Sequence, residues 1–188
     1  MARKMREILV VDVEATCWEG APPPGQQSEI IEIGWAVLDV PAGTIARNGT
    51  LLVRPARSQV SAFCTQLTTL TQAQVDAGVP FADACRFLEI ELAARSVTWA
   101  SYGAYDRRQF ARQCEAFGVP YPFGETHLNV KNLFALVHSL PREVGMAAAL
   151  DILGRKLEGT HHRAGDDARN IAFILASLIS PPQRQEAT

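Results

Sequence analysis

The chain has 188 residues, of which 47% are hydrophobic and 20% are charged, with a formal net charge of −2. This length and composition predict one globular domain with a sizeable core, expected over residues 1–180, and a polar C-terminal tail over residues 181–188. The weakly acidic balance excludes a strongly basic protein that coats nucleic acid. It does not exclude an enzyme that acts on nucleic acid.

Targeting and cysteine patterns point to a reduced, cytoplasmic protein without membrane association. The basic first residues lead into a short predicted strand rather than a secretory apolar core. No apolar stretch approaches the roughly 20 residues that a membrane helix needs. The cysteines are scattered and form no C-x-x-C pair, which indicates neither a zinc site nor a disulfide framework; they are Cys17, Cys64, Cys85 and Cys114.

The predicted elements begin with strands and continue with alternating helices and strands. Strands are expected over residues 7–13, 28–39 and 43–54, and a loop with three prolines follows the first. Helices and short strands then alternate to a last helix that ends before Pro181. The expected ranges are short helices within 64–76, a helix over 81–95, a strand over 97–102, a helix over 104–117, a strand over 128–130, and helices over 132–139, 144–153 and 164–179. This order predicts an α/β sheet protein.

Two carboxylates close the first predicted strand. The apolar run over residues 8–11 is typical of a buried strand, and Asp12 and Glu14 follow it with a spacing of two. Because side chains alternate along a strand, both project from one face at its C-terminal end. Two neighbouring acids raise each other's pKa unless a cation lies between them. Acidic turns are common, but this spacing favours a divalent metal site, most simply for Mg²⁺.

A third acid, Asp106, lies near the start of the helix predicted over residues 104–117. Positions four apart share a helix face, so Asp106 lies above Phe110 on the side expected to face the core. An acid in that position is costly unless it is paired or binds a metal. Taken alone, an acid favoured by the helix N-terminus is the more common interpretation.

Doubled histidines and doubled acids precede the last helix. They offer two equally spaced pairs, His161 with Asp166 and His162 with Asp167. Asp167 has the helical phase of residues that must be buried, Ile171, Ile174 and Leu178. Asp166 has the phase of residues better placed in water, Arg169 and Asn170. We therefore expect Asp167 to point inward with His162 as its companion, and Asp166 to be a solvated acid of the first turn.

These residues together resemble the DEDDh 3′-to-5′ exonucleases. The pattern is Asp-x-Glu after a strand, an Asp opening a helix in mid-chain, and His-x-x-x-x-Asp before the C-terminal helix, and the resemblance covers nearly the whole chain. The stretches over residues 12–19, 63–68 and 72–75 resemble the branch of histone-mRNA and small-RNA-trimming exoribonucleases. A sister class would need tyrosine four residues before the final Asp, where this chain has Arg163.

The resemblance implies a ribonuclease H-like fold with a mixed five-stranded sheet flanked by helices. It also implies that two Mg²⁺ or Mn²⁺ ions are held by four acids, Asp12, Glu14, Asp106 and Asp167. His162 would act as the general base, with Glu14 as a second catalytic residue beside the 3′-OH. The terminal nucleotide would be held by Glu14, Ala15, Thr16, Leu67 and His162.

The expected substrate is a single-stranded RNA or DNA 3′ end, with RNA slightly favoured, cut to nucleoside 5′-monophosphates. No accessory RNA-binding domain is expected in this chain. One alternative is a DNA-directed proofreading or trimming exonuclease, and another is a non-catalytic module that binds nucleic acid or a partner.

Other polar residues have simpler interpretations. Trp18 is as well suited to capping the sheet edge as to stacking on a base. Glu32, in an apolar strand, is expected to be a hydrogen-bonded structural carboxylate. For the arginines near Asp106, a solvated helix face is favoured over phosphate contact; they are Arg107, Arg108 and Arg112.

Overall fold

The computed structural model describes residues 6–179 of the protein. These residues form a mixed sheet with helices on both faces. The strands are β1 (Glu7–Ala15), β2 (Ile30–Asp39), β3 (Thr44–Arg54), β4 (Val79–Pro80), β5 (Thr98–Ser101) and β6 (His127–Asn129). Their order across the sheet is β4-β3-β2-β1-β5-β6. The first three strands are antiparallel, whereas β5 runs parallel to β1 and β6 parallel to β5. The α/β prediction is confirmed, and the predicted tail lies outside the described residues.

The sheet has six strands in the described part of the chain, one more than predicted. The additional strand, β4, consists of Val79 and Pro80 and pairs with the end of β3 at Val53 and Arg54. Two residues are too few to show the alternation by which a strand is found in sequence. Its second residue also forms the cap from which the next helix begins.

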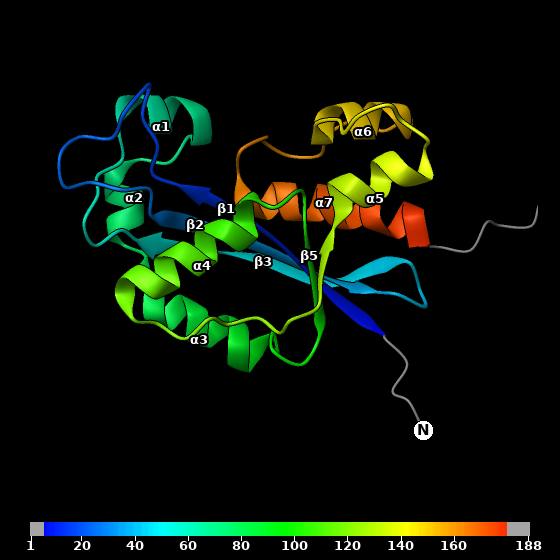
Figure 1. The fold of residues 1–188 in the computed structure, drawn as a ribbon, viewed down its shortest axis with the longest axis horizontal. Coiled ribbons are helices and arrows are strands. Elements are labelled where there is room, and N and C mark those ends of the chain that lie inside the picture. The colour runs from blue at the N-terminus through cyan, green and yellow to red at the C-terminus, as the bar shows by residue number, and fades with distance from the viewer. Residues whose placement is uncertain (1–5, 180–188) are drawn as a thin grey trace, which may run out of the picture.

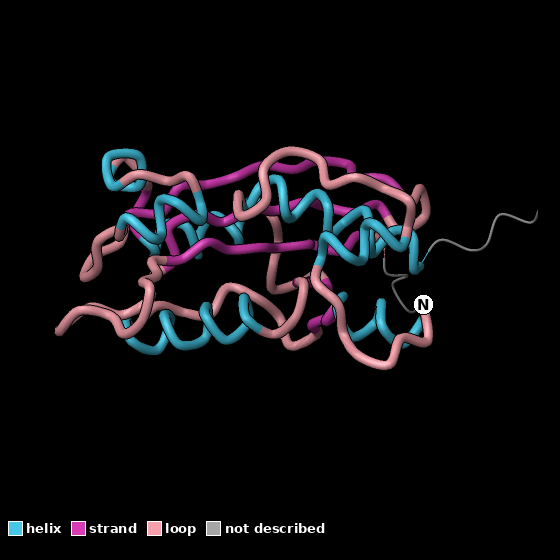
Figure 2. The backbone as a smooth tube through the Cα atoms, turned by 90° about the horizontal axis from the view of Figure 1, so that it is seen from above, coloured by secondary structure: helices cyan, strands magenta, loops and turns pink. Residues whose placement is uncertain are grey.

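Seven helices of the described chain cover the sheet (Figure 1). They are α1 (Ala62–Thr68), α2 (Gln72–Asp76), α3 (Phe81–Glu91), α4 (Tyr105–Phe117), α5 (Val130–Val137), α6 (Met146–Ile152) and α7 (Ala164–Ile179). Seen from above in Figure 2, the strands run along the length of the molecule with the helices alongside. Within residues 6–179, no helix has the length and apolar character to cross a membrane.

The alternation of β1 divides the core into two layers. Leu9, Val11 and Val13 pack into the cluster formed with α3 and α4. Ile8 and Val10 pack into the opposite cluster, with residues of α5, α6 and α7. Because side chains two apart share a face, Asp12 and Glu14 continue the second row onto the α7 side of the sheet.

A glycine lets α7 approach the sheet beside these acids. Gly34 of β2 is the register partner of Asp12. A Cβ atom built on Gly34 would lie 1.8 Å from the carbonyl oxygen of Ala164, the first residue of α7. The absence of a side chain at this position therefore brings the N-terminal turn of α7 directly against the end of β1.

Candidate active site

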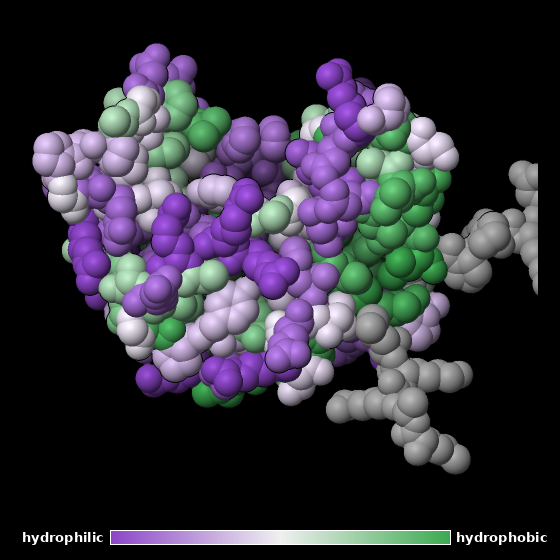
Figure 3. Space-filling view, in the orientation of Figure 1, coloured by the Kyte–Doolittle hydropathy of each residue, from purple (hydrophilic) through white to green (hydrophobic). Residues whose placement is uncertain are grey.

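The four predicted acids meet in one cleft. Asp12 and Glu14 come from β1, Asp106 from the first turn of α4 and Asp167 from the first turn of α7. All four line a cavity of about 320 Å³. In Figure 3 the surface is hollowed between the part that carries α1 and the part that carries α6. Three separate segments of the sequence therefore deliver carboxylates to one place.

Asp106 reaches the cleft from the far side of the sheet. Its side chain is only 3% exposed, and its Oδ1 accepts a hydrogen bond of 3.1 Å from the main-chain N–H of Val13. Burial raises the pKa of Asp106 to about 6, although this hydrogen bond acts in the opposite direction. The inward position predicted from the phase with Phe110, which is fully buried, is confirmed.

The remaining three acids form a tight group. Carboxylate oxygens of Asp12, Glu14 and Asp167 lie within 4.8 Å of one another. Burial, followed by the charge of Asp167, raises the pKa of Glu14 to about 8. The pKa of Asp12 is raised well above its ordinary value by burial and then by the charge of Asp106. Ionising this group in the absence of a cation is therefore unfavourable.

The chemistry of these donors fits divalent metal ions. Mg²⁺ and Mn²⁺ prefer carboxylate oxygens, and the cleft supplies oxygens from four side chains. A cation between the carboxylates would cancel the mutual repulsion that raises their pKa values. The residues that are present therefore fit the metal ions that the sequence led us to expect.

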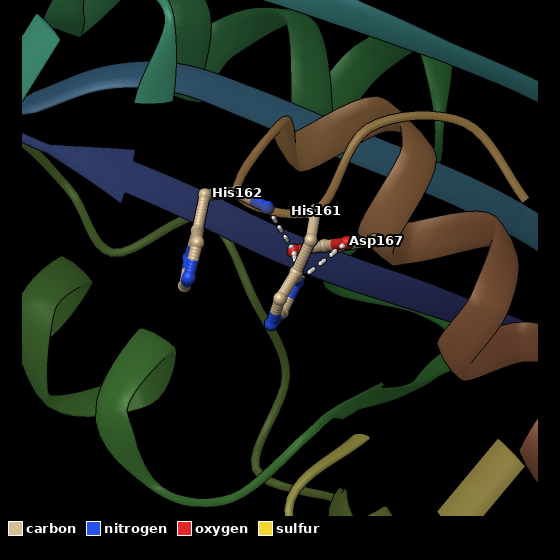
Figure 4. A group of neighbouring side chains, drawn as sticks. All are labelled: His161, His162 and Asp167. Carbon is tan, nitrogen blue, oxygen red and sulfur yellow. Dashed lines mark hydrogen bonds and ion pairs between the residues drawn. The ribbon is translucent and has the colours of Figure 1, made fainter. Parts of the chain in front are cut away.

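Two stacked histidines border the carboxylates (Figure 4). The rings of His161 and His162 lie 4.0 Å apart with an interplanar angle of 19°. Nδ1 of His161 lies 3.0 Å from one Asp167 oxygen and 3.3 Å from the other. His162 contacts Asp167 through its main-chain N–H, at 3.0 Å. His162 is therefore a neighbour of Asp167, as expected, but it bonds this acid through its main chain, and the ring that bonds Asp167 belongs to His161.

The ring of His162 faces Glu14 instead. Its Nδ1 lies 3.9 Å from Oε1 of Glu14, and the side chain is 40% exposed to the cleft. The backbone of His162 has a φ of 63°, a left-handed conformation that turns the chain just before α7. Burial and the neighbouring His161 lower the pKa of His162, so the ring is neutral near pH 7.

The two adjacent acids of α7 are separated as predicted, but their surroundings differ from the prediction. Asp167 is 4% exposed. Asp166 is not simply solvated, since it accepts a hydrogen bond of 2.7 Å from the N–H of Thr160 and pairs with Arg169. Asn170 is buried, against expectation, because its side chain bonds both main-chain polar groups of Glu158.

An ion pair between the buried Glu32 and the partly exposed Arg163 fixes the loop that carries the histidines. Glu32 of β2 is 1% exposed and accepts hydrogen bonds from Arg163 at 2.8 and 3.2 Å. The same carboxylate accepts the N–H of Ala164 at 2.9 Å and the hydroxyl of Thr50 at 3.0 Å. The expectation of a structural carboxylate at Glu32 is confirmed, and its partner Arg163 ties the His161–His162 segment to the sheet.

Only some of the residues predicted to hold a nucleotide line the cleft. Ala15 and Leu67 line the cleft, and the side chain of Leu67, on α1, is 38% exposed. Thr16 is fully buried, and its hydroxyl bonds the N–H of Glu29 at 2.9 Å and the carbonyl of Gln27 at 3.3 Å. Its side chain holds the turn after β1 and does not line the cleft.

Sequence reasoning missed several residues that line the cleft. They include Cys17, Tyr102, Tyr105 and Met146. Tyr105 directly precedes Asp106, which is a signal that could have found it. Met146 begins a separate helix and carries no such signal. The three arginines near Asp106 are exposed on α4 and do not line the cleft.

Comparison with known proteins gives the chain a family context. The family model described as Exonuclease matches residues 9–175. The chain is 31% identical to the rat protein 3′-5′ exoribonuclease 1 and 29% identical to the human protein of that name, over 92% of its own length and 52% of theirs. It is 27% identical to the Drosophila melanogaster protein 3′-5′ exonuclease Snipper, over 92% of its own length and 69% of that protein. The chain thus spans about half the length of the mammalian relatives.

Solved structures of other proteins have the same fold as this chain. The nuclease domain of 3′hExo, described as a DEDDh family member bound to rAMP, superposes with a TM-score of 0.85 at 28% identity, covering 94% of this chain and 92% of that one. A structure described as S. pombe Pop2p in its Mg²⁺- and Mn²⁺-bound form shares the fold at a TM-score of 0.70 and 18% identity, covering 93% of this chain and 64% of that one.

Proposed function

The chain belongs to the exonuclease family, and we propose that it is a metal-dependent 3′-to-5′ exonuclease that removes nucleoside 5′-monophosphates from single-stranded RNA. The observation that carries the proposal is the convergence of four carboxylates on one cleft beside an exposed imidazole. The choice of RNA is supported by the relatives that are named exoribonucleases.

The carboxylates would hold two Mg²⁺ or Mn²⁺ ions through Asp12, Glu14, Asp106 and Asp167. Two such ions stabilise the attacking and leaving oxygens of an in-line phosphoryl displacement. The protein fixes the carboxylates before the ions bind, since Asp106 is hydrogen-bonded to β1 and Asp167 to the histidine loop. This rigidity lowers the cost of organising the site for each turnover.

His162 accepts the proton of the attacking water in this proposal. Its pKa is lowered, so the neutral ring required of a base is present near pH 7. The ring is exposed in the cleft, and it is not engaged by Asp167, which holds only the His162 main chain. His161, in contrast, is bonded to Asp167 through its ring.

Glu14 would also contact the 3′ end, because it lines the cleft together with Ala15 and Leu67. Leu67 offers an exposed apolar surface on which a terminal base can pack. A ribose 2′-OH would add a hydrogen-bonding group that deoxyribose lacks. A DNA-directed trimming enzyme is the second candidate, because the same four acids serve both sugars.

A 5′-labelled single-stranded RNA tests the proposal. We expect a ladder of products shortened from the 3′ end with Mg²⁺ or Mn²⁺ and no ladder with EDTA. Asp12→Ala should abolish the ladder, whereas Asp83→Ala, an exposed acid in the first turn of α3, should not. Metal-independent cleavage, or an active Asp12→Ala protein, would refute the proposal. Tight RNA binding that EDTA does not affect, without turnover, would favour a non-catalytic binding module.

A panel of 3′ ends separates the two enzymatic candidates. Single-stranded RNA, single-stranded DNA and a duplex with a 3′ overhang are compared at equal concentration. We expect kcat/KM to be highest for single-stranded RNA. A preference for the DNA substrates would support the trimming enzyme instead.

The base role predicts a specific defect for His162→Ala. We expect the rate to fall about 10²–10⁴-fold while Mn²⁺ affinity is retained. Calorimetric titration with Mn²⁺, alongside the cleavage rate, checks both parts. An equally steep loss of Mn²⁺ affinity would show that His162 serves the metal ions rather than the water.

A further inference from the structure

The two histidines and Asp167 form a second group of possible metal ligands beside the four acids. Ligand atoms of His161, His162 and Asp167 lie within 4.8 Å of one another. This group contains two imidazole nitrogens, whereas the group of Asp12, Glu14 and Asp167 contains only oxygens. Asp167 is the one residue that both groups share.

The distance between His161 and Asp167 suits a shared tetrahedral ion. With Zn–N and Zn–O bonds of about 2.0–2.2 Å, two ligand atoms on one tetrahedral zinc lie about 3.3 Å apart. Nδ1 of His161 lies 3.0 and 3.3 Å from the two Asp167 oxygens. The His161–Asp167 contact is therefore already near the separation that one shared ion requires.

The histidine rings are presented to the cleft on the same side. In Figure 4 the rings of His161 and His162 lie parallel and extend in the same direction from the loop, so one ring must turn out of the stack for both nitrogens to bind one ion. The side chains are 45% and 40% exposed, so an ion can reach them from solvent. Asp167 beneath them is 5% exposed and is fixed by the main-chain N–H of His162.

We propose that His161, His162 and Asp167 form an inhibitory site for Zn²⁺ or a similar nitrogen-preferring transition metal. Imidazole ligands favour zinc, whereas Mg²⁺ prefers octahedral oxygen ligands. Bound zinc takes the imidazole of His162 and shares Asp167 with the acidic group. It therefore suppresses the Mg²⁺-supported reaction. The binding site stands on its own geometry, and only the inhibition rests on the proposed exonuclease function.

Zinc binding is tested first without substrate. The metal-free protein is titrated with Zn²⁺ by calorimetry, and Co²⁺ is added separately to record the visible absorption of a tetrahedral site. His161→Gln is compared with Asp12→Asn, which alters only the acidic group, and with His138→Gln, a histidine stacked on Phe134 outside the cleft. The side chain of His161 is 45% exposed and belongs to neither core cluster, so its replacement leaves the core intact.

We expect His161→Gln to weaken Zn²⁺ binding at least about tenfold, which is the least that loss of a supporting group at a metal site produces. Asp12→Asn, which loses the Zn²⁺ held among the acids, and His138→Gln should both keep the Zn²⁺ site that His161→Gln weakens, together with its tetrahedral Co²⁺ spectrum. Unchanged binding by His161→Gln, or no tight binding by the wild type, would overturn the proposal. A loss in Asp12→Asn equal to that in His161→Gln would place the ion among the acids and would also overturn it.

Inhibition is tested next in the RNA cleavage assay. With Mg²⁺ in excess, added Zn²⁺ should slow the wild type and should require at least about tenfold more metal to slow His161→Gln, in line with the weaker binding. Equal sensitivity of the two proteins would refute the inhibitory role. If the wild type cleaves no RNA at all, the proposed function fails, while the calorimetric result still decides whether zinc binds.

Discussion

Glu14 and Glu32 are direct neighbours across β1 and β2, yet their surroundings are opposite. Glu32 accepts hydrogen bonds from Arg163, from the N–H of Ala164 and from the hydroxyl of Thr50. Among residues 6–179, no hydrogen-bond donor reaches the Glu14 carboxylate, and its pKa is raised to about 8. One buried acid is satisfied by the protein, and the other is not.

The difference separates a structural acid from a functional one. Glu29 supports this distinction, because it is 1% exposed and accepts the N–H groups of Ala56 and Arg57 at 2.7 and 2.8 Å. A buried carboxylate that lacks such donors is costly and persists where a ligand supplies the missing charge. Glu14 therefore indicates a cation site. Glu32 instead holds in place the segment that carries the histidines of this site.

Replacing Glu14 by glutamine should raise stability in EDTA, whereas replacing Glu32 by glutamine should lower it. The largest expected effect is the loss of catalysis in Glu14→Gln. Glu14→Gln is expected to lower the cleavage rate about 10²–10³-fold, because it removes part of the preorganised charge at the reacting phosphate. In EDTA at pH 8 the same variant should unfold at a higher temperature than the wild type, because a repelling charge is gone. Single-turnover cleavage and thermal melts measure the two effects. Lower stability in EDTA would contradict the contrast.

Glu32→Gln should mainly reduce stability. The variant loses the charged partner of Arg163 and weakens the cap on the first turn of α7, at a cost of about 2–4 kcal/mol in the free energy of unfolding. Denaturant unfolding measures this loss, with Glu89→Gln as the control because Glu89 forms only an exposed pair with Arg95. A stability equal to that of the control would show that the Glu32 network contributes nothing.

Gly34→Ala tests the close approach between β2 and the first turn of α7. The added methyl group would collide with the main chain of Ala164, so α7 must shift away from β2, at a cost of about 1–3 kcal/mol. We also expect weaker Mn²⁺ binding, because Asp167 moves with the helix. Gly145→Ala is the matched control, since nothing lies within 4 Å of its added Cβ. Equal Mn²⁺ affinity in the two variants would contradict the dependence on α7.

The most gradual effect, counted per pH unit, is the pH dependence of stability in EDTA. The pKa of Glu14 is about 8 in the folded protein, against an ordinary value of 4.5, so the folded state binds more protons between these pH values. Stability should therefore fall as the pH rises from 4.5 to 8, by up to about 1.4 kcal/mol per pH unit from this group. Denaturant unfolding across this range measures the slope. Glu14→Gln should reduce the slope, leaving the part that Asp12 and Asp106 contribute, and an unchanged slope in that variant would assign the whole effect to these other groups.

Periodicity was sufficient to find most of the site. Strand alternation placed Asp12 and Glu14 on one face, and helical phase placed Asp106 and Asp167 inward, because these rules hold wherever the backbone is regular. The six-stranded sheet escaped prediction only at β4, which is too short to have a period.

The prediction failed where the chain is irregular. His161 and His162 precede α7 in a turn with a left-handed residue, so helical phase gave no information on which ring meets Asp167. Asn170 was expected in water because its face of α7 is polar, but the segment at Glu158 folds back over it. Contacts of this kind depend on loop paths that no local pattern records.

If the unsatisfied acids are metal ligands, the metal-free protein binds Mn²⁺ through them. A calorimetric titration compares the wild type with Asp12→Asn and with the surface control Asp83→Asn. We expect two Mn²⁺ ions for the wild type and for Asp83→Asn, as a two-metal mechanism requires, and the loss of at least one ion in Asp12→Asn. Equal Mn²⁺ binding by the wild type and Asp12→Asn would contradict it.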